Sequence, residues 1–501
     1  MKGHDYTKSL ALTFVVVVLP LDNFWSREVQ NVNCFSAPTK YSSHQKLQHS
    51  QQKLGSMSEF SEELFHFLDR QPQVSYRSVE LPFNISTKIG NKFIELERKY
   101  ESVDENEETK KRNTIALHLI STPTRLEECL PPKFQKDLTD YFNQQKENGL
   151  GGTSNKKQYS KIIHLHQDIW NFKRDIVHHR LMAQLGLGVH VETANNGRAA
   201  NRRIFARKTT ARRITSSIAM EFLEEHHLWG ATKAKHNYGL FIGSKGKSDS
   251  TDLNEKELVA VATFSAKRKI VRLGKPHRSH ELLRFCSKRD SNVVGGISKL
   301  VKAFVKEKFP DDIVTVVDRD WGDGFGWHSV GFHTVATMDP IVMTVCESID
   351  NDNCSHSQRR HLVGAGIKNS DISSSNDNNV GGNSTCVKRK DRIGLSAEIL
   401  NELDSLDSVE DVLCTLSNHR HFPVYDTGVE RLMKVISYDP DGKELQPIAS
   451  TILEMWQNSQ PTYAKEYYSS NRGIATLLKH VSTTPSTLPL LIGDNIGDHS
   501  C

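Results

Sequence analysis

Residues 280–308 read HELLRFCSKRDSNVVGGISKLVKAFVKEK, and this stretch decides the fold expected for the centre of the chain. Residues 280–287 predict a strand, and residues 297–308 place apolar side chains at helical spacing. The loop between them, 288–296, ends in Gly295-Gly296, where the backbone can approach a ligand closely. The first turn of the following helix offers N–H groups and the positive end of the helix dipole. The stretch predicts either a pyrophosphate-binding loop or a plain turn into a helix.

The segments on either side of this stretch predict a sheet. Residues 238–242 and 257–265 are expected to be neighbouring strands, and 312–317 is rich in β-branched residues. A Gly-rich turn at 321–326 leads to a short helix that ends at Gly331-Phe332, and a last strand is expected near 333–338. The order β-β-β-loop-α-β-α-β predicts an α/β (α+β) fold for a domain at 195–345.

The regions before and after this domain carry weaker patterns. A smaller α/β domain is predicted at 58–190, with helices at 60–68, 131–145 and 168–185, the last capped by Asp168, and strands at 93–96 and 162–165. Residues 346–440 form an extension with helical 395–416 and a strand at 422–426. Its Asn/Ser-rich segment 369–386 predicts a disordered insertion. A C-terminal helical tail is expected over 441–501.

Composition excludes several classes of protein. The chain of 501 residues is 37% hydrophobic and 25% charged, which is globular rather than fibrous or wholly disordered. The eight cysteines include no CxxC pair, so neither a disulfide scaffold nor a Cys-rich zinc module is expected. No run reaches the roughly 18 apolar residues of a membrane span. The net charge of +5 is mild, so any nucleic-acid role requires local clustering of basic residues.

The first 57 residues read as a targeting presequence. The apolar run 10–21 follows Lys2 and Lys8, as in a signal peptide, and residues 35–57 contain no acidic residue, as in a transit peptide. The junction NCFSAP (33–38) is similar to the bipartite presequences of algae with secondary plastids. Plastid targeting is therefore expected, with an ordinary secretory signal or a wrongly assigned start as the alternatives.

Two basic blocks flank the central stretch. Residues 194–219 carry seven basic side chains and no acid, and residues 267–289 carry nine against one acid, Glu281. Such blocks can neutralise phosphates of DNA or RNA, although they can equally form a solvated face. The side chains selected as nucleic-acid or substrate contacts are Arg203, Arg207, Lys208, Arg213 and Arg284.

Two further motifs bear groups that can do acid–base chemistry. In EEHHLWG (224–230), Glu225 or His227 is a candidate general base and Trp229 a stacking platform, unless the motif only caps a helix. In DRDWGDG (318–324), at a strand end where ligands often bind in α/β sheets, Asp318 or Asp320 is a candidate proton acceptor, unless Asp318 and Arg319 form a structural ion pair. The three carboxylates of DRDWGDG could also bind a cation, although the remaining ligands of an EF-hand loop are lacking, and adjacent His226 and His227 point different ways, so they predict no two-histidine metal site.

Seven segments, in order, resemble the GNAT-type N-acyltransferase domain found in phage homing endonucleases and phage DNA-modification acyltransferases. They are IFARK (204–208), FLEEHHLWG (222–230), ELVA (257–260), LRFC (283–286), VGGISKL (294–300), DRDWGDG (318–324) and, more faintly, PVYDTG (423–428). The resemblance implies a mixed sheet in which two splayed strands open a V-shaped gap for the cofactor. It also implies that an acyl-CoA binds at the glycine loop through Val294, Gly295, Gly296, Ser298 and Arg289.

The chain departs from this family at one position. A Tyr that protonates the leaving thiolate usually precedes the Gly-Phe pair, and Trp327 stands there instead. An indole N–H cannot act as an acid near neutral pH, and the adjacent His328 is the only substitute in the motif. The glycine loop also lacks the usual Arg/Gln-x-x-Gly-x-Gly/Ala form.

The region before residue 190 is similar to the nuclease domain of the very-short-patch-repair type that accompanies such domains in phage homing endonucleases. The similar segments are VELP (79–82), FIELERK (93–99) and IHLHQDIW (163–170). Pro82 replaces an expected aspartate, which indicates a degenerate nuclease because Mg²⁺ needs clustered carboxylates. The function expected is a GNAT-like acyltransferase acting on or near nucleic acid. The alternatives are a non-catalytic nucleic-acid-binding protein derived from a homing endonuclease and a residual Mg-dependent nuclease.

Overall fold

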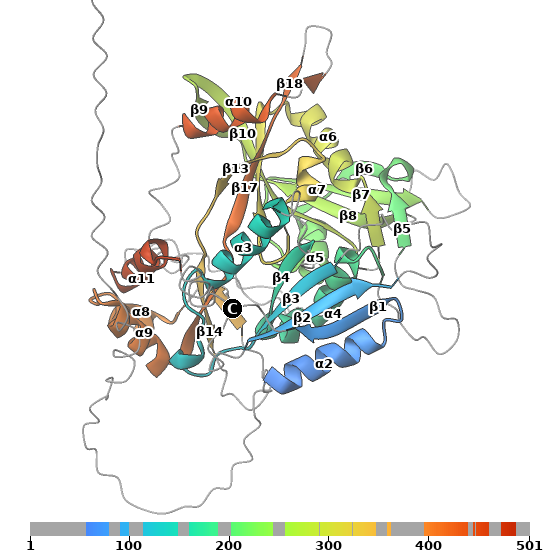
Figure 1. Cartoon of the computed structure of the whole chain (residues 1–501). Coiled ribbons are helices and arrows are strands. Elements are labelled where there is room, and N and C mark those ends of the chain that lie inside the picture. Colours follow the sequence, from blue (N-terminus) through green and yellow to red (C-terminus); the bar gives the residue numbers. More distant parts are fainter. Residues whose placement is uncertain are drawn as a thin grey trace, which may run out of the picture. The chain divides into compact units, whose positions relative to one another are not determined.

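A computed structural model gives the architecture of the chain (Figure 1). It describes residues 57–79, 91–99, 114–148, 160–188, 202–243, 256–289, 291–322, 324–346, 358–361, 395–438, 444–445, 447–459 and 472–486. All of these lie in one compact unit, Gly55–Cys501. The fold is α/β, as predicted, with several separate sheets. The expected presequence up to residue 56 and the insertion 369–386 lie outside the described residues.

The first sheet is formed by β1 (Val74–Val79), β2 (Asn91–Arg98), β3 (Thr114–Ile120) and β4 (Lys161–His166), in that spatial order. β1, β2 and β3 are antiparallel, while β3 and β4 are parallel. A parallel pair needs a crossover connection, and α3 (Phe134–Asn148) provides it.

Both faces of this sheet are covered. α2 (Met57–Asp69) and α4 (Gln167–Gln184) bury one face around Leu64, Ile94, Leu117 and Trp170, and α3 covers the other through Phe134 and Leu138. Helices on both faces explain why β3 is buried along its whole length. The N-cap of α4 is His166 rather than the predicted Asp168, which lies buried in its first turn.

The second sheet carries the central stretch. Its strands lie in the order β13 (His333–Thr337), β17 (Val429–Val435), β12 (Asp312–Asp318), β10 (Lys275–Ser287), β8 (Lys256–Phe264), β7 (His236–Gly243) and β6 (Thr210–Arg213). An additional strand, β9 (Arg268–Arg272), pairs with β10 as a hairpin. The predicted strands at 238–242, 257–265, 280–287, 312–317 and 333–338 are all present.

One strand of this sheet comes from the segment that the sequence assigned to the extension. β17 lies between β12 and β13 and pairs antiparallel with both. The central domain therefore does not close at residue 345, because its sheet takes a strand from beyond the insertion. Sequence patterns are local, and the pairing of β17 depends on a register set by neighbours that are distant in the chain.

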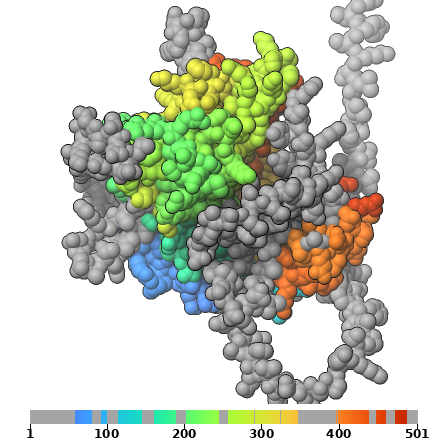
Figure 2. Space-filling model, turned by 180° about the vertical axis from the view of Figure 1, so that it is seen from behind, coloured from blue at the N-terminus to red at the C-terminus, as the bar shows by residue number. Residues whose placement is uncertain are grey.

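Helices cover both faces of the second sheet as well. α6 (Gly296–Lys308) buries Leu300 and Phe304 against one face. α5 (Ser216–His226) packs around Val261 on the opposite face, where α10 (Ala449–Gln457) packs on β13 and β17. Seen from behind, residues of this sheet and its flanking segments form one broad surface, coloured green to yellow (Figure 2).

The remaining elements are short. β5 (Arg202–Phe205) pairs in parallel with β11 (Ser291–Val294), a strand inside the predicted loop 288–296. β14 (Val342–Cys346) lies between β15 (Gln358–His361) and β16 (His421–Tyr425), and β18 (Ser437–Tyr438) pairs with β19 (Glu444–Leu445). The predicted helical region 395–416 is two helices, α8 (Ala397–Leu403) and α9 (Val409–Asn418), which share a core with α11 (Arg472–Thr483). No helix among the described residues is long and apolar enough to cross a membrane.

Candidate functional site

Two parallel strands of the second sheet separate along their length. β10 and β12 pair only over three residue pairs, the last of them Glu281 with Val314. A bulge in the pairing of β10 with β8 lies between Leu282 and Arg284. Beyond it, β10 pairs with β8 and β12 pairs with β17, and a hydrogen bond of 3.0 Å from Thr315 Oγ1 to the Leu282 carbonyl joins the two strands where they part. Bulges bend strands, so the bulge accounts for the unpaired stretch between residues 283–287 and 316–318, which we call the gap.

The glycine loop follows the strand that bends away. β11 leads directly into Gly295, which caps α6 with a left-handed backbone (φ 77°) that favours glycine. A Cβ on Gly296 would lie 3.1 Å from Val293 Cγ1, which makes this position tight as well. Ser298 lies in the first turn of α6, where backbone N–H groups have no acceptor within the helix.

The first basic block is brought to this loop. β5 places Phe205 opposite Val294, and Ala206 Cβ would lie 3.7 Å from a Cβ on Gly295. Lys299 fixes the contact, because its ammonium group donates to the carbonyls of Ala206 and Thr209. Two segments about ninety residues apart in the chain therefore meet at the N-terminus of α6.

Two arginines beside this loop share one aromatic ring. The guanidinium carbons of Arg203 and Arg207 lie 5.3 and 5.0 Å from the centroid of Phe205. Both side chains are exposed, and within the described part of the chain neither pairs with a carboxylate. Cation–π contacts hold such groups in place without neutralising them. The result is a pair of ordered positive charges next to the start of a helix.

On the face of the gap covered by α5, a tryptophan binds the end of β12. Trp229 Nε1 donates to Asp318 Oδ2 at 2.9 Å, and the Asp320 backbone N–H donates to Asp318 Oδ1 at 3.0 Å. The structure thus brings together two residues from the two motifs selected in the sequence. Trp229 serves as a hydrogen-bond donor here, and Asp318 is half-buried.

His227 has a role other than the predicted one. Its Nδ1 accepts a hydrogen bond of 3.1 Å from the Trp229 backbone N–H, so the proton of the neutral ring lies on Nε2. Burial, with Arg284, Arg180 and Lys173 nearby, lowers the pKa of His227 to about 3. A neutral imidazole whose acceptor nitrogen is occupied cannot act as a general base, and it instead orders the turn that carries Trp229.

Asp320 forms structural hydrogen bonds through both its side chain and its backbone. Its carboxylate accepts hydrogen bonds from the backbone N–H and the hydroxyl of Thr427, and its backbone carbonyl accepts from His164 N–H at 2.9 Å. The side chain is buried, and its Oδ2 lies 3.8 Å from His166 Nε2. Asp320 therefore joins the loop after β12 to β4 and to residue 427, which leaves Asp318 as the candidate proton acceptor. Asp323 lies outside the described residues.

Glu225 and Arg289 bind each other. Arg289 donates to Glu225 Oε1 at 3.2 Å and to Asp175 Oδ2 at 3.0 Å, which ties α5 to α4. The predicted base and the predicted cofactor ligand thus form a bridge between helices. We retain neither in the candidate site.

A residue that the sequence did not indicate lies at the gap. Arg180 of α4 stacks over the Trp321 ring, 4.8 Å from its centroid. Burial lowers the pKa of Arg180, and this is opposed by Asp318, Cys286 and Asp320. Cys286 belongs to β10 and Asp318 to β12, so the guanidinium lies near both separating strands. Arg180 reads in sequence as one charge among several on a helix, and only its placement distinguishes it.

The second basic block is largely neutralised. Five of its nine basic residues pair with acids: Arg268 with Glu281 of the same block, Arg272 with Asp312, Arg278 with Asp311, Lys288 with Glu257, and Arg289 with Asp175 and Glu225. In the first block, Arg202 also pairs with Glu257, and Arg213 with Glu307. Arg203, Arg207 and Lys208 remain exposed and without a described carboxylate partner.

Arg284 lies in β10, and Trp327 packs beside the same strand. Arg284 is half-buried and donates to the Leu283 carbonyl at 2.8 Å, so it is less exposed than Arg203, Arg207 and Lys208. Trp327, in the short helix α7 (Phe325–His328), packs edge-on against Phe285 and Phe332. His328 Nε2 lies 3.2 Å from Thr334 Oγ1. The indole therefore fills space beside β10.

In its described residues, the first sheet shows no arrangement typical of a nuclease centre. Glu95 is buried and bound by Arg77 through two bonds of 3.1 Å. His118 and His164 share a buried hydrogen bond of 2.8 Å between their Nδ1 atoms. Among the described residues there is no group of three or more His, Cys, Asp or Glu side chains that could hold a metal ion. Glu80 and Pro82 lie outside them.

Comparison with known proteins assigns no class. No family model matches the chain. A search of curated proteins also finds no match. The geometry described above is therefore the basis for any functional assignment.

Proposed function

We propose that the domain built on the second sheet is a GNAT-like N-acyltransferase-fold domain that binds an acyl-CoA and acts on or beside nucleic acid. The observation that carries the proposal is the separation of β10 from β12 after Glu281 and Val314. The resemblance implies such a separation, in the form of a V-shaped gap between two splayed strands. The strand that bends away leads through β11 to the glycine loop.

The anion site of the proposal lies at the start of α6. The N–H groups of its first turn and its positive dipole end suit a pyrophosphate. Arg207, held on Phe205 by a cation–π contact, adds a positive charge without a described carboxylate partner. Val294, Gly295, Gly296 and Ser298 supply the backbone of this site.

The chemistry of the proposal rests on Asp318. It stands at the end of β12, at the gap, where its carboxylate can accept the proton of an attacking amine. Trp229 and Asp320 N–H orient it. Trp327 offers no acid, so the leaving thiolate takes its proton from water.

Exposed positive charges support the proposed action on or beside nucleic acid. Arg203, Arg207 and Lys208 lie beside the glycine loop and suit phosphate groups of DNA or RNA. A non-catalytic nucleic-acid-binding protein is the second candidate, because the same charges serve it without a cofactor. A residual nuclease is the third, and plasmid nicking with Mg²⁺ that Glu95→Ala abolishes would establish it. Delivery to a plastid is also part of the proposal.

Calorimetric titration of the full chain tests the cofactor. CoA and acetyl-CoA are expected to bind, and pantetheine, which lacks the pyrophosphate and the nucleotide, is expected to bind about 100-fold more weakly or not at all. Two charge-assisted contacts of about 1.5 kcal/mol each account for that factor. Absence of CoA binding, with binding of an oligonucleotide intact, would instead establish the second candidate.

A further inference from the structure

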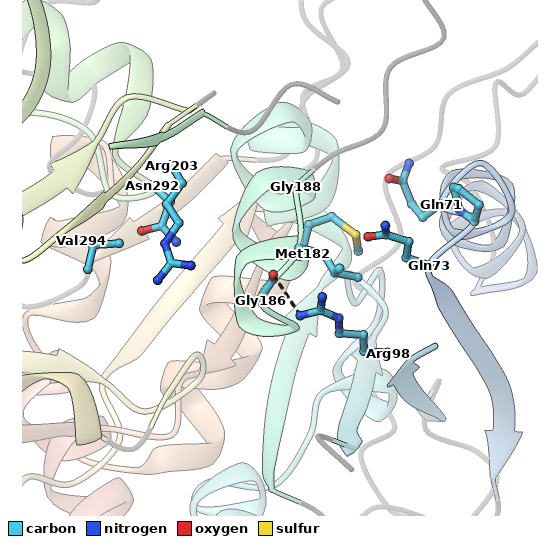
Figure 3. A pocket seen from close by; sticks show the side chains of 11 residues that line it. Gln71, Gln73, Arg98, Met182, Gly186, Gly188, Arg203, Asn292 and Val294 are labelled. Atoms are coloured by element: carbon cyan, nitrogen blue, oxygen red, sulfur yellow. Dashed lines mark hydrogen bonds between the residues drawn. The ribbon is translucent and has the colours of Figure 1, made fainter. Parts of the chain in front are cut away.

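A cavity of about 450 Å³ lies between the first sheet and the β5–β11 ladder (Figure 3). One wall comes from the turn after α2, the end of β2 and the end of α4. The other comes from Arg203 of β5 and from Asn292 and Val294 of β11. The volume lies within the range of ligand pockets for small molecules. Val294 directly precedes Gly295, so the cavity adjoins the glycine loop.

The charge of the lining selects an anion. Arg98 and Arg203 contribute guanidinium groups from opposite walls, and none of the described residues that line the cavity carries a carboxylate. Arg98 donates to the Gly186 carbonyl at 3.4 Å, at the end of α4 (Figure 3). Guanidinium groups have the fork geometry that binds phosphate oxygens through two bonds.

The rest of the lining suits a nucleobase. Gln73 and Asn292 provide amide groups, which can both donate to and accept from the edge of a base, while the amide nitrogen of Gln71 donates to the Phe67 carbonyl at 3.4 Å. Pro72, Met182 and Leu187 provide apolar surface on which a flat ring can pack. Phosphate-binding, edge-reading and ring-packing groups therefore line one cavity.

We infer that this cavity binds a nucleoside phosphate. The ligand is either the nucleotide end of a cofactor or one nucleotide of a nucleic-acid strand. The first domain then supplies one wall of a binding site. This role does not require a nuclease centre in that domain. This assignment does not depend on the binding of an acyl-CoA at Gly295.

Binding of adenosine 3′,5′-bisphosphate to the full chain, measured by calorimetry, tests the assignment. Arg203→Gln is expected to raise the Kd at least about tenfold, because a hydrogen bond to a charged group contributes about 1.5 kcal/mol or more. Arg202→Gln is the matched control. It removes the same charge from the adjacent residue, whose side chain binds Glu257, and is expected to change the Kd less than twofold.

A second matched pair tests the opposite wall. Arg98→Gln is expected to raise the Kd at least about tenfold, and the neighbouring Lys99→Gln is expected to change it less than twofold. If an arginine variant does not fold, Asn292→Ala takes its place in the test, because Asn292 lines the cavity at an exposed position. This variant is also expected to raise the Kd of the bisphosphate. The assignment is overturned if the bisphosphate does not bind, or if Arg203→Gln and Arg202→Gln have equal effects.

Competition identifies the source of the nucleotide. Displacement of the bisphosphate by CoA, sensitive to Arg203→Gln, assigns the cavity to a cofactor. Displacement by a short single-stranded oligonucleotide, if it is also sensitive to Arg203→Gln, assigns the cavity to one nucleotide of a nucleic-acid strand. If the bisphosphate binds and CoA does not, the cavity stands and the acyl-CoA proposal fails, so the two failures are distinguishable.

Discussion

Trp229 donates its indole N–H to Asp318 at 2.9 Å, and this bond joins the turn after α5 to the end of β12. The two residues are 89 positions apart in the chain. The bond orients the carboxylate to which we assign proton transfer. It also leaves Asp318 with two donors, one on each oxygen.

Trp229→Phe removes one of these donors. We expect the free energy of unfolding to fall by about 1–2 kcal/mol more than for Trp327→Phe, because a hydrogen bond to a charged, half-buried acceptor is lost. Trp327→Phe is the control, since the described contacts of that indole are with aromatic rings. Urea denaturation measures both variants. Equal losses would show that the bond contributes nothing.

The buried histidine pair predicts a loss of stability in acid. Burial lowers the pKa of His118 well below 6.5 and that of His164 to about 3. The unfolded chain takes up protons below about pH 6.5 while the folded pair stays neutral, so stability is full above that pH and falls toward pH 3. Each histidine adds a slope of up to about 1.4 kcal/mol per pH unit.

His164→Gln tests this pH dependence. The variant removes one titrating group, so the slope of unfolding free energy between about pH 6 and pH 5 is expected to decrease by about one proton. Urea titrations at several pH values measure it. An unchanged slope would mean that His164 does not stay neutral in the folded chain.

The exposed arginines predict a difference in salt dependence. Arg207→Gln should weaken binding of the full chain to an oligonucleotide and reduce the slope of log K against log salt concentration by about one. Arg213→Gln removes the same charge from a side chain that already binds Glu307 at 3.2 Å, so its slope should change less. Fluorescence anisotropy across a salt series compares them. Equal slopes for the two variants would contradict the contact assigned to Arg207.

The sequence predicted those parts of the fold whose signals are local. The helix α6 and the strands β7, β8, β10 and β12 follow from apolar periodicity and β-branched residues. The position of β17 between β12 and β13 could not be predicted, because strand order depends on contacts far apart in the chain. β11 was missed because it is only four residues long and begins with two polar residues, Ser291 and Asn292, as a loop would.

The sequence indicated the residue types at the candidate site better than it indicated the contacts that each residue makes. Asp318, Trp229 and the glycine loop lie where the motifs indicated polar chemistry, but Asp320 binds Thr427 and Arg289 bridges two helices. The counts of basic residues did not reveal that acids from other segments would pair with four of the nine basic residues of the second block. Ion pairing is a property of the folded chain, so charge runs overstate the free charge.

A charge change at the start of α6 tests the central claim most directly. Ser298→Asp adds a negative charge to the first turn, which favours the helix dipole but repels a pyrophosphate. Ser217→Asp adds the same charge to the first turn of α5 and is the matched control. Calorimetric titration with CoA is expected to show at least about tenfold weaker binding for Ser298→Asp and unchanged binding for Ser217→Asp. Unchanged CoA binding by Ser298→Asp would contradict a pyrophosphate site at the Gly295 loop.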